Sequence, residues 1–217
     1  MRLTCPSVVV VSALSLVGLF PGAARAQEPA QMLKGMLGSR FVVFREKVQD
    51  ELKLTSEQRS KLNDRVDVTI QETQEFFQSV QDAKPEDRQK KQGEYAQKAN
   101  QKLETLLKET LKEDQLKRLR QIGLQHEGLF AIGMPDVSKE LKITDEQRKQ
   151  FMEVVQSFQK KVQPLIKEMQ EGGDPQEIQP KMMKLRKDHQ VQIEAILTDA
   201  QKQQWKEMIG KPFSVED

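Results

Sequence analysis

One five-residue pattern occurs four times in this chain and constrains its fold more than any other feature. It is Leu-Thr-Ser-Glu-Gln at 54–58, Leu-Lys-Glu-Asp-Gln at 111–115, Ile-Thr-Asp-Glu-Gln at 143–147 and Leu-Thr-Asp-Ala-Gln at 197–201. A threonine followed three residues later by glutamine is a capping box, in which each side chain binds a backbone N–H of the first helical turn. Each copy therefore predicts the start of a helix. Lys112 replaces threonine in the second copy, which removes half of that cap. The positions that define the pattern are Leu54, Thr55, Gln58, Leu111, Gln115, Ile143, Thr144, Gln147, Leu197, Thr198 and Gln201.

The four copies form two pairs. Residues 51–55, Glu-Leu-Lys-Leu-Thr, return 89 positions later as Glu-Leu-Lys-Ile-Thr, whereas residues 111 and 115 return 86 positions later. Such offsets indicate an internal duplication, and two copies are too few for a solenoid. We expect two tandem helical hairpins. The predicted division is a signal peptide at 1–26, an apolar lead-in helix at 27–44, a first unit at 45–122, a connector at 123–135 and a second unit at 136–217.

The first 26 residues have the pattern of a secretory signal peptide. Arg2 precedes an apolar stretch from Val8 to Phe20, and Ala24-Arg25-Ala26 is a small-x-small cleavage pattern. The stretch is shorter than the ~20 residues of a spanning helix. Cleavage would remove two of the 35 basic residues and none of the 33 acidic ones, so the mature chain would be neutral. We therefore expect a periplasmic protein that binds no nucleic acid.

The composition favours an elongated all-α fold without a sheet. Aromatic residues make up 5% of the chain and charged residues 31%, as in long amphipathic helices with a narrow apolar seam. No segment alternates with period two between turns. Breaks at Lys84-Pro85 and at Gly172–Pro175 divide each unit into two arms. A last helix of each unit would end at a capping glycine, Gly123 or Gly210.

Paired Leu-Thr-x-x-Gln patterns behind a signal peptide, in a helical chain whose mature part has no cysteine, resemble the Spy/CpxP (LTxxQ) family of periplasmic proteins. The resemblance covers about residues 45–210. It implies a bent helical hairpin that dimerises into a cradle, with ATP-independent chaperone activity on unfolded envelope proteins. The alternative that it implies is an accessory role in envelope-stress or metal sensing through protein–protein binding. Four patterns in one chain, where relatives have two, predict a monomeric pseudo-dimer, with a homodimer as the alternative.

No catalytic motif accompanies these patterns: the chain lacks a phosphate-binding glycine loop, a nucleophile elbow and a His-Glu-x-x-His sequence. We expect no enzyme activity, no nucleotide and no cofactor. The two histidines, His126 and His189, lack partners at metal-ligand spacing, so we predict that they are packed or surface residues.

The lead-in contains the best candidate for an exposed client-binding patch, Phe41, Val42, Val43 and Phe44. The alternative is that this segment packs back onto the hairpins. The expected partners are unfolded or partly folded proteins. A structural spacer without clients is a third possibility.

Overall fold

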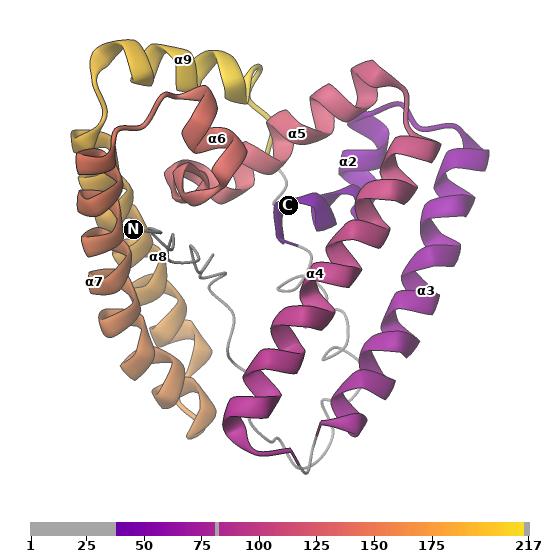
Figure 1. The fold of residues 1–217 in the computed structure, drawn as a ribbon, viewed down its shortest axis with the longest axis horizontal. Helices are drawn as coiled ribbons and strands as arrows, with labels where there is room; N and C mark the ends of the chain where they lie inside the picture. Colours follow the sequence, from indigo (N-terminus) through magenta and orange to yellow (C-terminus); the bar gives the residue numbers. More distant parts are fainter. Residues whose placement is uncertain (1–37, 81–82, 215–217) are drawn as a thin grey trace, which may run out of the picture. The chain divides into compact units, whose positions relative to one another are not determined.

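A computed structural model describes residues 38–80 and 83–214, and all regular structure in these ranges is helical (Figure 1). The all-α prediction is therefore confirmed for the described residues. The predicted signal peptide, and the part of the lead-in before residue 38, lie outside them. The elements are η1 Gly38–Phe44, α2 Glu46–Glu51, α3 Ser56–Ser79, α4 Pro85–Thr110, α5 Glu113–Glu127, η2 Gly128–Gly133, α6 Pro135–Glu140, α7 Asp145–Gln170, α8 Pro175–Ile196 and α9 Asp199–Ile209, where η denotes a 3₁₀ helix.

The described residues form two compact units. The N-terminal unit consists of residues 38–126 together with 209–214, and the C-terminal unit of residues 127–208. Each unit has the same element order: a 3₁₀ helix, a short α-helix, two long arms and a further helix. Residues 209–214 thus belong with the N-terminal unit, whereas the sequence predicted that they belong to the second unit.

The arms of the C-terminal unit, α7 and α8, run antiparallel. The ion pair Lys181–Glu168 lies near the turn, and the bond from Gln147 to the Ile196 carbonyl oxygen lies at the far end. Contacting residues are close in sequence near the turn and far apart in sequence at the other end. Two helices with this pattern run in opposite directions.

The arms of the N-terminal unit, α3 and α4, are also antiparallel. Thr73 meets Tyr95 at 3.0 Å, and Gln58 donates to the Thr110 carbonyl oxygen at 2.8 Å. The two pairs of arms therefore run in the same relative direction.

The predicted apolar patch does not form an exposed surface. Val42 and Val43 are 2% and 0% exposed, and Phe41 and Phe44 are half-buried against the same core. The cause is that η1 packs on α2 and α3, which bury its apolar side. The prediction of an exposed patch was therefore wrong, and the alternative of a segment packed back onto the unit holds.

The predicted helix end at Gly123 was also wrong. Gly123 is buried inside α5, which continues to Glu127, and packing outweighs the cost of about 1 kcal/mol for a glycine in a helix. The expected connector instead contains η2, in which Ala131 and Ile132 are 1% and 4% exposed. They lie 89 positions after Val42 and Val43. The duplication therefore begins with the 3₁₀ helices. By contrast, Gly210 does follow a helix end, with φ +62°.

Candidate functional site

Three of the four repeated patterns form complete capping boxes. In the first, the Thr55 hydroxyl accepts from the Gln58 backbone N–H at 3.2 Å, and the Gln58 side-chain oxygen accepts from the Thr55 N–H at 3.0 Å. The boxes at residues 144–147 and 198–201 have the same two bonds. At the second pattern only the glutamine half is present, and Gln115 Oε1 accepts from the Lys112 N–H at 2.9 Å. The hydroxyl bond is missing because a lysine side chain has no oxygen that can accept a backbone N–H.

The two glutamines of the N-terminal unit also bind each other. Gln58 Nε2 donates to Gln115 Oε1 at 2.8 Å, and Gln115 Nε2 donates to Gln58 Oε1 at 3.3 Å. Each amide has a second donor, which Gln58 gives to the Thr110 carbonyl and Gln115 to the Leu52 carbonyl. Each side chain therefore uses both N–H groups and accepts two bonds, which is its full capacity.

The C-terminal unit contains the same arrangement. Gln147 Nε2 donates to Gln201 Oε1 at 2.7 Å, and Gln201 Nε2 donates back to Gln147 Oε1 at 3.0 Å. Their second donors bind the carbonyl oxygens of Ile196 at 2.9 Å and Leu141 at 3.1 Å. The orientation of each amide is fixed, because the reversed amide would place an oxygen against a carbonyl oxygen.

Each amide pair joins the ends of four helices. The accepting carbonyls belong to the last turns of α2 and α4 in one unit, and of α6 and α8 in the other. These carbonyls lie at helix ends and have no hydrogen-bond partner within their own helices. The capping boxes likewise bind backbone N–H groups that have no partner within the helices that follow. We call this arrangement the glutamine junction: Gln58 with Gln115 in one unit, and Gln147 with Gln201 in the other.

A tight turn leads into each junction. Lys53 and Lys142 follow the ends of α2 and α6 with φ of 51° and 52°. The Leu54 N–H binds the Gln49 carbonyl, and the Ile143 N–H binds that of Ser138, which is the Schellman pattern. The repeated Glu-Leu-Lys-(Leu/Ile)-Thr sequence therefore encodes a helix end, a left-handed residue and the next cap.

The sequence predicted the caps and missed the amide pairing. A signal was present, because a hairpin between two patterns brings its ends together and hence brings the two glutamines together.

The surface of α7 is the second candidate site. Only Phe151 among its large apolar residues is buried, and most others are half-buried. Met152, Val155, Val162 and Ile166 recur at spacings of three, seven and four residues, so they share one side of the helix. We call these four residues the α7 strip. Met152 is 38% exposed and the other three are half-buried. Of the side chains that reach α8, Ser157 and Glu168 lie on the opposite side of α7, and Phe158, which meets His189, lies between them and the strip.

In the N-terminal unit, polar side chains join α3 to α4 beside Thr73. Glu72 on α3 binds Lys102 on α4 at 2.9 Å and Arg65 on its own helix at 3.1 Å. Burial alone would raise the pKa of Glu72, but its bonds and charge attraction to Lys102 and Arg65 lower it below the usual range. Burial raises the pKa of Tyr95, whose hydroxyl meets Thr73. Thr73 lies 89 positions before Val162 and occupies the corresponding place in α3. At this place the N-terminal unit has a polar residue where the α7 strip has an apolar one.

His189 is a packed residue. It is fully buried, its Nδ1 lies 2.7 Å from the Leu185 carbonyl oxygen, and its ring meets Phe158 edge-on at 5.3 Å. The carbonyl can only accept, so Nδ1 carries the proton. His126 lies in the last turn of α5. Within the described ranges, no three His, Cys, Asp or Glu side chains gather as a metal site.

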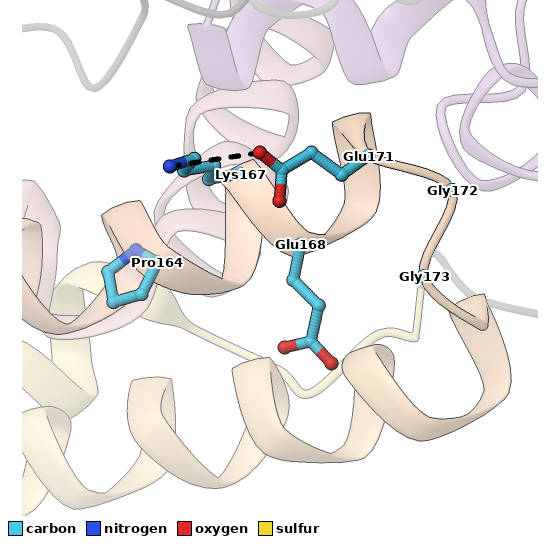
Figure 2. Close-up of a pocket in the computed structure, with 6 residues that line it drawn as sticks. All are labelled: Pro164, Lys167, Glu168, Glu171, Gly172 and Gly173. Atoms are coloured by element: carbon cyan, nitrogen blue, oxygen red, sulfur yellow. Dashed lines mark ion pairs between the residues drawn. The ribbon is translucent and has the colours of Figure 1, made fainter.

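An open depression lies at the turn between α7 and α8. Figure 2 shows Lys167 and Glu171 approaching each other, at 3.7 Å, while Glu168 points away from them. Gly172 has φ +90°, and a Cβ on Gly173 would lie 2.7 Å from the Glu168 carbonyl oxygen. The glycines are therefore required by the turn. The lining residues are Pro164, Lys167, Glu168, Glu171, Gly172 and Gly173.

Comparison with protein-family models, with curated proteins and with solved structures finds no match. Among the described helices, none combines the length and the apolar character that crossing a membrane requires.

Proposed function

We propose that this chain is an ATP-independent, chaperone-like protein of the periplasm that binds unfolded or partly folded envelope proteins. The resemblance of the repeated patterns to the Spy/CpxP family suggests this class. The observation that supports it best is the α7 strip, a row of apolar side chains that the unit's own core leaves partly open.

The strip suits weak and general binding. Fully burying a valine, isoleucine or methionine side chain contributes roughly 1.5–3 kcal/mol. A half-buried side chain therefore retains roughly half of that for a client. Methionine adapts to varied apolar partners. Charged residues on the same helix, including Lys160 and Lys161, are exposed and favour fast encounter.

The test is suppression of aggregation without nucleotide. A guanidinium-denatured protein is diluted into buffer with increasing amounts of this chain, and light scattering is recorded. We expect wild-type protein to suppress scattering, and the double variant Val155→Ser/Ile166→Ser to need several times more protein for the same effect. The matched control, Gln156→Ser/Gln163→Ser, changes exposed polar residues of the same helix and should behave as wild type.

Circular dichroism melting of each variant separates lost binding from lost folding. The proposal fails if wild-type protein does not suppress scattering at equimolar or higher ratio. If the strip variant stays folded and suppresses scattering as well as the control, clients bind elsewhere.

A further inference from the structure

The last described residues of the chain lie against α5 in the N-terminal unit. Gln125 Nε2 donates to the carbonyl oxygens of Ile209 at 2.6 Å and Lys211 at 2.8 Å. Its Oε1 accepts the Phe213 N–H at 2.7 Å. Arg118 Nη1 donates to the same Lys211 carbonyl at 2.8 Å. Two side chains thus bind three backbone groups of the tail.

The aromatic ring of the tail completes the contact. Phe213 is half-buried against the core of the N-terminal unit, and the Arg118 guanidinium lies 5.9 Å from its ring centroid. Arg118 is itself held by Glu51 at 2.6 Å. This arginine is therefore oriented before the tail arrives, which reduces the entropy cost of binding.

The bend into this segment depends on Gly210. Its φ is +62°, and a Cβ there would lie 2.4 Å from Gln121 Nε2. The backbone at Gly210 thus lies against the Gln121 side chain of α5, and its positive φ favours glycine.

We infer that this face of α5 is a peptide-binding site and that the chain's own C-terminal tail is its reversibly bound ligand. The bonds go to backbone groups, and the side chains of Lys211 and Pro212 are exposed. The site therefore selects an extended segment with one aromatic residue and tolerates variation elsewhere. The inference is independent of the proposed function, because it concerns another helix and needs no client.

The tail has a large advantage over a free peptide. A tethered ligand acts at an effective concentration of about millimolar for a short linker. A peptide added in trans will therefore bind well only when the tethered tail is weakened.

The test uses a fluorescein-labelled peptide of residues 208–217 and full-length protein, with anisotropy as the readout. We expect Phe213→Ala protein to bind the peptide at least tenfold more tightly than wild type. Adding Arg118→Ala to that variant should weaken binding about tenfold, the effect of losing one or two bonds. Arg59→Ala in the same background is the matched control, because Arg59 belongs to the same unit and pairs with Asp50. It should bind as Phe213→Ala does.

A second measurement needs no variant. Excess unlabelled peptide should speed hydrogen exchange of the Phe213 amide in wild-type protein, because the trans ligand displaces the tail, and should leave the α5 amides protected. The inference is overturned if Phe213→Ala, shown by circular dichroism to be folded, binds the peptide no better than wild type. It is also overturned if Arg118→Ala and Arg59→Ala have equal effects, or if the Phe213 amide does not respond.

Discussion

The glutamine junction makes a quantitative prediction about Gln147→Ala. In the C-terminal unit this side chain donates to the Ile196 carbonyl and to Gln201, and it accepts from the Thr144 N–H and from Gln201. A role limited to capping would remove only the bond to Thr144. The two accounts therefore differ in the number of interactions lost.

The expected loss of stability follows from these four bonds. Each contributes about 0.5–1.5 kcal/mol net, and leaving a buried partner unpaired costs about 1–3 kcal/mol. Gln201 is 9% exposed, so its amide cannot simply turn to water. We expect Gln147→Ala to lower the free energy of unfolding by about 2–4 kcal/mol, whereas Thr144→Ala should cost about 1 kcal/mol, as for an ordinary N-cap.

A double-mutant cycle on Gln147 and Gln201 tests the pairing directly. Urea unfolding followed by the fluorescence of Trp205, the only tryptophan, reports on the unit that contains both residues. We expect a coupling of about 1–2 kcal/mol. The control cycle pairs Gln147 with Gln115, which belongs to the other unit, and should be additive within about 0.5 kcal/mol. A Gln147–Gln201 coupling no larger than the control would refute the junction and leave only the caps.

Three further outcomes are expected. Lys53→Gly should stabilise the protein by about 0.5–1 kcal/mol in urea unfolding, because glycine removes the cost of φ 51°; a loss of stability would contradict this. Burial raises the pKa of Glu127, and the charge of Arg186 offsets part of this rise. Ionisation of Glu127 therefore lowers the stability of the folded protein as pH rises from the usual 4.5 through the folded-state pKa. Glu127→Gln should therefore raise the melting temperature at pH 7 and change little below pH ~4, and an equal shift at both pH values would show another cause. Thr55→Ala should cost about 1 kcal/mol in urea unfolding and leave aggregation suppression by the folded protein intact; lost suppression at full stability would make the pattern a binding site.

Much of the fold follows from local signals in the sequence. Thr55 and Thr144 mark helix starts because a capping box is satisfied by residues three positions apart, without help from the rest of the chain. Gly172-Gly173 and Pro175 mark a turn for equally local reasons. The sequence therefore locates the arms well.

The sequence-based predictions were wrong where tertiary packing determines a helix end or the exposure of a segment. Gly123 has a local preference for helix ends, yet it is buried within α5. Phe41 and Val43 form an apolar segment whose exposure depends on η1 meeting α2 and α3. Comparing the segment with Phe130 and Ile132, 89 positions later, would have shown that it opens a repeated unit.

The two copies are alike at the helix ends and differ along the arms. Gln58 and Gln147 occupy corresponding places and make the same kinds of bonds. Farther along the same helices, Thr73 binds a tyrosine in one copy, while Val162 belongs to the apolar α7 strip in the other. A side chain that satisfies helix ends can change only with loss of stability, because two backbone groups and two bonds to the partner amide depend on it. A side chain on an arm has no such constraint, so the arms are where the two copies could acquire different surfaces. The proposed chaperone-like function is therefore to be tested on α7, while the glutamine junctions hold the ends of the arms together.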